Sequence, residues 1–440
     1  MSTRSPLSAT IDTLAYGGNG VCRIDGKVCF VPFSCPGDEV LLRIVSQKKS
    51  YCMAEITSIT VPSPSRIDPA CSIFGECGGC QWQHVSYSTQ LEQKYKLFSE
   101  AMWRGARVGT DKIRAVTAAP SPYAYRSRVQ FKVKIDRDSV CIGFFRTGSH
   151  ELVEAGEGCP VAVAAINSLL IDLKKCISRF SGVSRITDIA IDAGLHGAAI
   201  CIFLNGKDSG GTSSFFREAA GELEGCSGLL LVQGGQNQPE LVWGSADVLY
   251  EMPREDPGDT PFQLSYRSGG FAQINQDQNR NMLPLIRTLG KFSSKDSLLD
   301  VYSGNGNFSI PLSPGVAVVA GIEGDAGSIL SAMRNVDTNG ATNVEFIHDD
   351  ALWGVRGMRL SGRRFDTVLI DPPRAGAGAV SEEIALLQPG RIIYVSCDPS
   401  TLARDCSKFA TYGYQVEESV PVDMFSQTFH LESVTVLTRN

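Results

Sequence analysis

The stretch LLDVYSGNGNFSIPLS, residues 298–313, decides the fold class of the C-terminal part of this 440-residue chain. An apolar run is followed by a turn with Gly304 and Gly306, and then by residues that can start a helix. Such glycines let the backbone approach a ligand closely, and a helix N-terminus favours electronegative groups. The third glycine of a dinucleotide-binding turn is absent, since Phe308 and Ser309 stand there. We predict a strand, a tight turn and a helix, an arrangement that also occurs without any ligand.

Further β-like runs follow this one at regular intervals. Helical segments separate the first five runs, which predicts parallel strands, while the short last connection fits an antiparallel strand. Seven strands with one reversed near the end are typical of an α/β, Rossmann-like methyltransferase domain. The expected strands are 298–303, 316–324, 344–350, 365–371, 391–397, 414–423 and 434–439.

The N-terminal part has a different pattern. Residues 8–60 alternate short β-like runs with turns rich in Gly, Asn and Asp, which predicts a small β-barrel of the OB kind. A proline-rich linker, 61–68, leads to mixed α/β sequence. We therefore predict domains at 1–62, 63–265 and 266–440. Residues from about 90 to 120 can pack on either neighbour.

Composition excludes several classes of protein. The chain is 43% hydrophobic and 20% charged, and it shows neither a signal segment nor an apolar run of membrane-spanning length. We expect a soluble cytoplasmic protein with no membrane partner, and a monomer. Its 14 cysteines are not expected to form disulfides, because the cytosol keeps thiols reduced.

Charge is distributed unevenly along the chain. The net charge is −6, yet segment 104–134 holds eight Lys or Arg against one acid, so it carries +7 and the remainder −13. Tyr123, Tyr125 and Phe131 are interleaved with these cations. Cations that meet phosphates beside rings that stack on bases suit single-stranded nucleic acid. By itself the segment also fits a solvated basic surface with aromatic residues in the core.

Acids stand at the ends of three successive predicted strands. Glu323 can accept hydrogen bonds from two ribose hydroxyls, the Asp349–Asp350 pair can meet an adenine edge, and Asp371 ends the fourth strand. This pattern suggests one adenosine-containing ligand. S-adenosyl-L-methionine fits better than a nicotinamide cofactor, because no pyrophosphate-binding loop is present.

The run RIIYVSCDPSTLARD, 391–405, places Cys397 where a buried strand stops. In open α/β sheets, ligands bind at this end of the strands. C5 of uracil is a poor nucleophile, but a thiolate that adds to C6 makes C5 able to attack a methyl group. A base must then remove the C5 proton, and Glu432 precedes the last strand. An inert thiol and a surface acid are the alternatives for these two residues.

These segments together resemble the RNA uracil-C5 methyltransferase family. The resemblance implies that Cys397 is the nucleophile and Glu432 the base. It also implies a pocket for cofactor and target base lined by Gln273, Tyr302, Asn307, Glu323, Asp350 and Asp371. Ser426 departs from the proline usual in the family, and the position of Asp350 varies between Asn and Asp. The matching motifs are FAQIN (271–275), LDVYSGNGNF (299–308), IEG (322–324), LIDPPRAGAG (369–378), IIYVSCDPSTLARD (392–405) and HLES (430–433).

The N-terminal segment looks like a TRAM domain, an OB-like RNA-binding module. Cys71, Cys77 and Cys80 have the spacing C-x5-C-x2-C, and Cys159 is a fourth candidate ligand. Spacing alone slightly favours structural zinc. The resemblance to the 23S ribosomal RNA branch of the family implies a [4Fe–4S] cluster instead, with a structural role.

The predicted function is thus S-adenosyl-L-methionine-dependent formation of 5-methyluridine in 23S ribosomal RNA. The target uridine would flip out of a single-stranded loop, with Arg126 and Arg128 holding the RNA near the pocket. One alternative is the same reaction on the T-loop of tRNA. Another is a non-catalytic RNA-binding or ribosome-assembly factor with a redox-sensing cluster.

Overall fold

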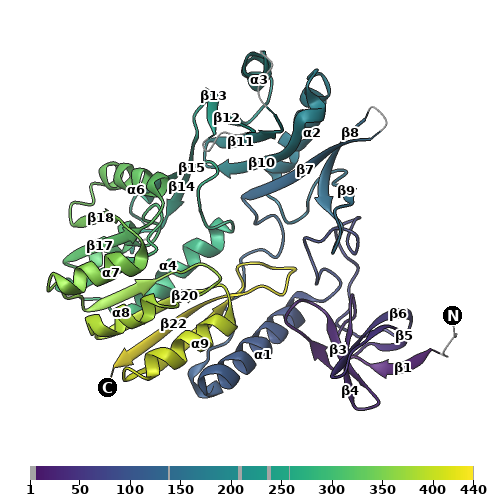
Figure 1. Ribbon diagram of the computed structural model, residues 1–440, viewed down its shortest axis with the longest axis horizontal. Coiled ribbons are helices and arrows are strands. Elements are labelled where there is room, and N and C mark those ends of the chain that lie inside the picture. Colours follow the sequence, from purple (N-terminus) through teal and green to yellow (C-terminus); the bar gives the residue numbers. More distant parts are fainter. Residues whose placement is uncertain (1–5, 137–138, 207–210, 235–238, 257, 440) are drawn as a thin grey trace.

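The computed structural model describes residues 6–136, 139–206, 211–234, 239–256 and 258–439. Three large sheets follow one another along the chain, and a two-stranded hairpin lies between the second and the third (Figure 1). Among the helices of these residues, none is long and apolar enough to cross a membrane. All 14 cysteines are free thiols, and seven of them are buried, as expected for small apolar core residues.

The N-terminal sheet has six strands in the order β1-β5-β6-β4-β3-β2. Its core is small, and three of its buried side chains are the thiols Cys22, Cys29 and Cys52. The predicted limit at residue 62 falls directly after the last strand of this sheet. The strands are β1 (Leu7–Thr10), β2 (Thr13–Leu14), β3 (Gly20–Ile24), β4 (Lys27–Val31), β5 (Glu39–Gln47) and β6 (Tyr51–Val61).

The central sheet has the order β13-β12-β11-β10-β7-β8-β9, and two helices pack on it in a shared apolar core. The strands are β7 (Arg128–Asp136), β8 (Ser139–Phe145), β9 (Leu152–Glu154), β10 (Ile186–Gly194), β11 (Gly197–Leu204), β12 (Cys226–Gln233) and β13 (Glu240–Gly244). The two helices are α2 (Ala164–Ser178) and α3 (Thr212–Ala220), and a short 3-10 helix, η2 (Val183–Arg185), lies between them along the chain.

A hairpin of β14 (Asp247–Met252) and β15 (Phe262–Arg267) leads from the central sheet to the C-terminal one. Its Tyr250 and Phe262 share an apolar core with Leu298 of the C-terminal sheet. The predicted domain limit at 265 lies inside β15.

The C-terminal sheet has the order β18-β17-β16-β19-β20-β22-β21, and β22 alone among its strands is reversed. This confirms the predicted α/β architecture, with strand limits that differ by a few residues. Its strands are β16 (Ser297–Val301), β17 (Val318–Glu323), β18 (Val344–His348), β19 (Thr367–Ile370), β20 (Arg391–Ser396), β21 (Tyr414–Val422) and β22 (Glu432–Arg439). Its helices are α4 (Gln276–Gly290), α5 (Ser309–Leu312), η3 (Ser313–Gly315), α6 (Ala326–Asn339), α7 (Ala351–Leu360), α8 (Val380–Leu387) and α9 (Pro399–Ala410).

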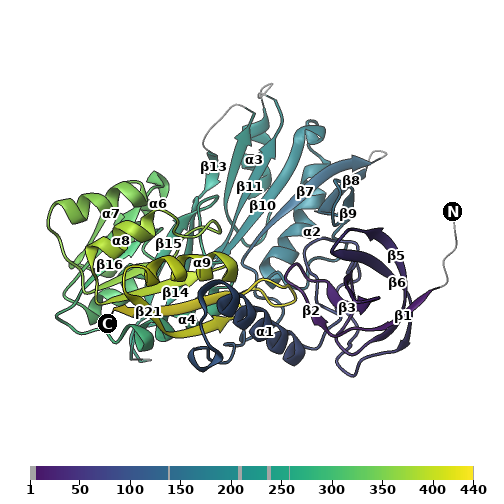
Figure 2. The ribbon, with the colours of Figure 1, turned by 60° about the horizontal axis from the view of Figure 1, so that its bottom comes forward.

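Helix α1 (Tyr87–Ala106) joins the first sheet to the third, and η1 (Thr110–Lys112) follows it. Both ribbon views show α1 between α9 and the N-terminal strands (Figures 1 and 2). Phe98 and Met102 belong to the same apolar core as Leu402 of α9. On another side, the Gln93 side chain accepts hydrogen bonds from Thr13 Oγ1 and the backbone N–H of residue 14, at 2.7 and 3.0 Å. Of the two placements that the sequence left open, α1 thus takes the one against the C-terminal sheet.

Candidate active site

A cavity of about 610 Å³ lies at the carboxyl ends of the C-terminal strands. The turn after β16 and the ends of β17, β19 and β20 line it, as does the start of β22. Six of the eight predicted catalytic and pocket residues line this one cavity: Gln273, Tyr302, Glu323, Asp371, Cys397 and Glu432.

Strand register brings the two predicted catalytic residues together. In the antiparallel pair of β20 and β22, Val395 faces Val434 and Ser396 faces Ser433. The next step of the ladder places Cys397 opposite Glu432.

The residues after the cysteine explain why the strand ends there. Asp398 caps α9, accepting hydrogen bonds through Oδ1 from the N–H groups of Ser400 and Thr401, both at 2.9 Å. Pro399 occupies the first helical position, where its missing N–H costs nothing. The Cys-Asp-Pro sequence therefore turns the chain sharply from strand to helix and leaves the thiol at the turn.

Burial and neighbouring acids determine the electrostatics of this pair. Burial first, and then the carboxylates of Glu432 and Asp371, raise the pKa of the Cys397 thiol to about 12. Burial and the nearby Asp371 also raise the pKa of Glu432 well above its usual value. Glu432 is only 3% exposed, and its Oε1 has no hydrogen-bond partner among the residues described. Since a buried oxygen of this kind is costly to leave unpaired, it marks a place for a ligand atom.

The other end of the cavity is shaped by Glu323. Its carboxylate accepts hydrogen bonds from the backbone N–H groups of Gly304, at 2.9 Å, and Asp325, at 2.7 Å. Tyr302 has a φ of +68°, a strained value that turns the chain sharply at the end of β16. These contacts fix the glycine turn against the end of β17.

Asp371 is a further acidic residue that lines the cavity. Gln273 Nε2 donates to its Oδ2 at 3.2 Å. Burial and the neighbouring Asp300 raise the pKa of Asp371 to about 7. The carboxyl group can therefore be either a donor or an acceptor near neutral pH.

Two predicted pocket residues lie outside the lining of this cavity. The Asn307 amide exchanges hydrogen bonds with Asn279 at 2.8 and 3.0 Å and accepts another from the Tyr250 hydroxyl at 3.1 Å. Asp350 is exposed and caps α7, accepting from the N–H of Leu352 at 2.9 Å. Both residues serve the local structure, and a ligand contact for either stays a prediction.

The sequence analysis did not single out three residues that line the cavity, Phe271, Arg374 and Phe425. Phe271 is 67% exposed. Arg374 is exposed and has no hydrogen bond or ion pair within the described part of the chain. Phe271 lies in the FAQIN motif and Arg374 in the DPPRAGAG motif. These two motifs are the features of the sequence from which the two residues could have been predicted.

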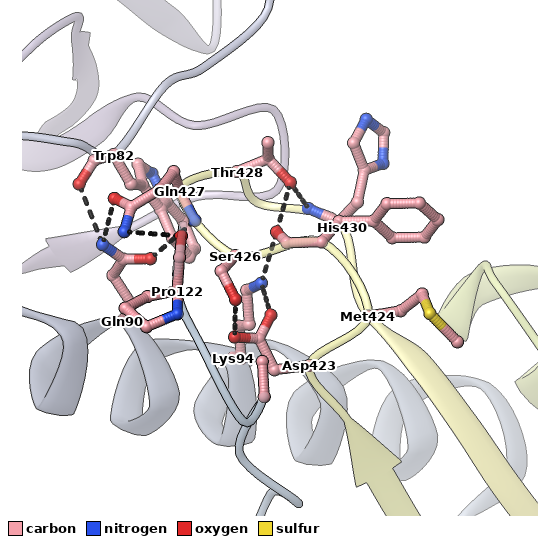
Figure 3. A network of polar contacts seen from close by, with 12 residues as sticks. Trp82, Gln90, Lys94, Pro122, Asp423, Met424, Ser426, Gln427, Thr428 and His430 are labelled. Atoms are coloured by element: carbon pink, nitrogen blue, oxygen red, sulfur yellow. Dashed lines mark hydrogen bonds and ion pairs between the residues drawn. The ribbon is translucent and has the colours of Figure 1, made fainter. Parts of the chain in front are cut away.

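The connection between β21 and β22, residues 423–431, carries Phe425 and leads into Glu432. Figure 3 shows how α1 holds this connection: Lys94 forms an ion pair with Asp423, and both side chains are fully buried. Lys94 Nζ also donates to the carbonyl of Phe425 at 3.0 Å. The hydroxyls of Tyr87 and Ser426 each donate to Asp423 Oδ2 at 2.7 Å. This network fixes the chain just before the predicted base.

Gln427 ties the same connection to a second region. Its side chain accepts a hydrogen bond from Gln90 of α1 at 2.9 Å, and its carbonyl accepts from the N–H groups of Gln81 and Trp82 (Figure 3). The connection therefore spans from the cavity to the segment that directly follows Cys80.

The four predicted ligand thiols, Cys71, Cys77, Cys80 and Cys159, line one smaller cavity of about 70 Å³. Thr428 of the connection also lines it. Within the described ranges, no three His, Cys, Asp or Glu side chains are positioned to hold a single metal ion. The structure thus gathers the thiols around one space but does not set them around one ion.

The two arginines expected to hold RNA have other surroundings. Arg126 lines the thiol cavity, where its charge opposes the rise in the pKa of Cys77 and Cys80 that burial causes. Arg128 pairs with the buried Asp192 and donates to the carbonyl of Gly270 at 2.5 Å. The expectation that Arg128 contacts RNA is not supported by this placement, which instead fixes the backbone beside Phe271.

Two family models match the chain. Residues 255–440 match the tRNA (Uracil-5-)-methyltransferase model. Residues 7–65 match the TRAM domain of tRNA (uracil(54)-C(5))-methyltransferase.

Relatives match over the whole length. The chain is 32% identical to the 23S rRNA (uracil(1939)-C(5))-methyltransferase RlmD of Edwardsiella ictaluri, over 99% of this chain and 96% of that protein. It is also 32% identical to an RNA methyltransferase of Thermosynechococcus vestitus, over 98% of each. Among solved structures, the tRNA (uracil-54, C5)-methyltransferase of Pyrococcus abyssi, in complex with S-adenosyl-L-homocysteine, shares the fold with a TM-score of 0.74 at 24% identity. That match covers 98% of this chain and 99% of the other.

The buried pair of Lys94 and Asp423 yields a stability prediction. Asp423→Asn keeps the side-chain shape but leaves the Lys94 ammonium buried without its counter-ion, so we expect the free energy of unfolding to fall by about 3–5 kcal/mol. Urea denaturation measures this. The control is Glu55→Gln, which breaks an exposed pair with Arg43 and should cost less than about 1 kcal/mol. Equal losses in the two variants would contradict the role given to the pair.

Proposed function

This chain belongs to the tRNA and rRNA uracil-C5 methyltransferase family, and from that premise we propose that it methylates C5 of a uridine in 23S ribosomal RNA. The observation that carries the proposal is the position of Cys397 opposite Glu432 in one cavity. A thiol and a carboxylate on the same side of a flat base are what this chemistry needs.

S-adenosyl-L-methionine, when bound, supplies an electrophilic methyl group. The cavity residues fit such a group, because Glu323 and the Gly304 turn form a polar cradle at one end and Cys397 lies in the same cavity. In the proposal, the Glu323 carboxylate accepts hydrogen bonds from the ribose hydroxyls. Tyr302 packs beside the adenosine.

Cys397 begins the reaction in this account. Its thiolate adds to C6 of the uracil ring, and electron density moves onto C5 and the O4 carbonyl. Because burial and the neighbouring carboxylates of Glu432 and Asp371 raise the pKa of the thiol, the pocket disfavours a reactive thiolate before substrate binds. A protonated Asp371 beside Gln273 can donate a hydrogen bond to a carbonyl of the ring and stabilise the charge that develops there.

Glu432 completes the reaction. After methylation C5 bears both a methyl group and a hydrogen, and the carboxylate removes that proton. The C–H electrons restore the C5–C6 double bond, and the C6–S bond breaks to release Cys397. A raised pKa makes Glu432 a stronger base once it is ionised. Its unpaired Oε1 is the atom we assign to this proton transfer.

The RNA substrate reaches the pocket as a flipped nucleotide, because C5 and C6 are inaccessible within a stack. Phe271 is the exposed ring that we assign to stacking on the flipped uracil. The relatives that match over the full length and bear a specific name act, by that name, on uracil 1939 of 23S ribosomal RNA, which favours this substrate. The structural neighbour is named for tRNA, which makes the T-loop uridine the second candidate. We place the reaction in the cytoplasm and expect a monomer.

The substrate is tested by methylation in vitro. Purified protein with S-adenosyl-L-methionine is incubated separately with unmodified 23S ribosomal RNA and tRNA transcripts, and 5-methyluridine is mapped by mass spectrometry of nuclease fragments. We expect one product in a 23S fragment. Product in tRNA alone would assign the T-loop instead, and product in neither would refute the function.

We also propose a [4Fe–4S] cluster on Cys71, Cys77, Cys80 and Cys159, since all four thiols line one cavity. A tetrahedral zinc site with Zn–S bonds of 2.3 Å also suits four thiolates and holds their sulfurs about 3.8 Å apart. A cuboidal cluster holds its four thiolates farther apart. Its role here is structural: it would tie the 71–80 loop to residue 159 and, through Gln427, to the connection before Glu432.

Glu432→Gln is predicted to allow methyl transfer but to block removal of the C5 proton and release of Cys397. The amide cannot accept the C5 proton, so Cys397 should stay bound to the methylated ring. We expect a covalent protein–RNA species on denaturing gels and at least a hundred-fold loss of turnover, within the usual range for loss of a general base. The matched control, Glu345→Gln on β18, lies outside the cavity lining and should leave turnover unchanged. Normal turnover by Glu432→Gln would contradict its role as the base.

The cluster proposal predicts a visible absorption spectrum. Protein purified without oxygen should be brown and contain about four irons per chain, and Cys159→Ser should lose this absorption. The buried Cys176→Ser is the control, because it lies outside the thiol cavity and should retain the colour. A colourless wild-type protein containing zinc would refute the cluster.

A further inference from the structure

A turn of the N-terminal TRAM domain reaches the end of β20. The Tyr16 hydroxyl donates a hydrogen bond to Asp398 Oδ2 at 2.9 Å, and Asp398 directly follows Cys397. Oδ1 of the same carboxylate already caps α9, so the contact with Tyr16 is additional to the helix cap. Trp82 Nε1 holds the turn by donating to the carbonyl of Gly18 at 3.0 Å.

Three aromatic rings meet at this place, one from the TRAM domain and two from the connection between β21 and β22. Tyr16 contacts Phe429 edge to face, with ring centroids 5.1 Å apart. Phe429 lies against His430 at 4.1 Å with an angle of 36° between the rings. Tyr16, Phe429 and His430 form what we call the aromatic ledge.

The ledge lies beside the Cys397 end of the cavity. The Arg374 guanidinium opposes the rise in the pKa of Tyr16 that burial causes, and after burial it contributes to the lowered pKa of His430. Burial and the nearby cations lower the pKa of His430 to about 4, so the imidazole is neutral at physiological pH. The ledge therefore offers uncharged rings next to an exposed guanidinium that can meet a phosphate.

Exposure distinguishes the ledge from a simple contact between domains. Tyr16 remains 43% exposed, and Phe429 and His430 are half-buried. Rings that only joined two domains would be buried between them, because burial is what makes such contacts stabilising. Ring surface left open beside a reactive thiol is available to a ligand.

We propose that the aromatic ledge of Tyr16, Phe429 and His430 is a stacking site for the base that neighbours the target uridine. The inference rests on the proposed function and extends it. When a uridine rotates out of its stack, the adjacent base loses a stacking partner, and an aromatic ring can replace it. The TRAM domain thereby contributes directly to the mouth of the active site, besides binding RNA elsewhere.

A double-mutant cycle tests the stacking site. The substrate is a hairpin transcript of the 23S segment that contains the target uridine, with two versions that lack the base on the 5′ or the 3′ side of the target. With wild-type protein, one of the two abasic RNAs should lower kcat/KM about ten-fold, the order expected for loss of one base–aromatic stack. Phe429→Leu and Tyr16→Leu should lower kcat/KM on the complete RNA and show less than a two-fold further loss on the abasic one. Tyr51→Leu, an exposed TRAM ring away from the cavity, should show the full abasic penalty.

A fluorescence measurement at saturating protein makes the result independent of methyl transfer. 2-Aminopurine at the sensitive position should be quenched on binding to wild-type protein and to Tyr51→Leu, and much less on binding to Phe429→Leu. The stacking site is overturned if the wild-type protein forms 5-methyluridine but methylates both abasic RNAs within two-fold of the complete RNA. It is also overturned if the wild-type protein forms 5-methyluridine but does not quench 2-aminopurine. A wild-type protein that quenches the probe but forms no 5-methyluridine would refute the proposed function and leave the stacking site standing.

Discussion

The antiparallel pairing of β20 with β22 is the constraint on which the site depends. In a sheet of parallel strands alone, only the carboxyl ends of the strands would meet at this edge of the sheet. The reversed last strand adds its first residue there, so Glu432 begins β22 beside Cys397, the residue that follows β20. A shift of one residue in this register would turn the carboxylate to the other face of the sheet. The chemistry we assign to the pair thus follows from one strand ladder.

Helix α1 stabilises that arrangement from outside the sheet. One helix contacts the TRAM domain through Gln93, the connection before Glu432 through Lys94, and α9 through Phe98. The TRAM domain, the connection before Glu432 and α9 therefore all pack against this one helix. A buried ion pair is a costly way to hold a loop, but it permits few alternative positions, which suits a base that must meet one proton.

The sequence predicted the parts that local pattern controls. Apolar runs and glycine turns located all seven C-terminal strands, and residues at strand ends, such as Glu323 and Cys397, line the cavity as expected. Local patterns could not predict which residues far apart in the sequence form hydrogen bonds or ion pairs with each other. The ion pair of Arg128 with Asp192 and the hydrogen bonds of Asn307 with Asn279 join residues too far apart in the sequence for a local pattern to pair them. The family motifs contained Phe271, but its exposure is visible only in three dimensions.

The central claim is that Cys397 bonds transiently to C6 of a uracil ring. RNA in which 5-fluorouridine replaces the target uridine tests it most directly, because fluorine on C5 cannot be removed as a proton. Incubation with S-adenosyl-L-methionine should give a stable protein–RNA adduct, and peptide mass spectrometry should locate the methylated nucleotide on Cys397. The account is contradicted if the unsubstituted RNA is methylated while the fluorinated RNA gives no adduct, or an adduct on another residue.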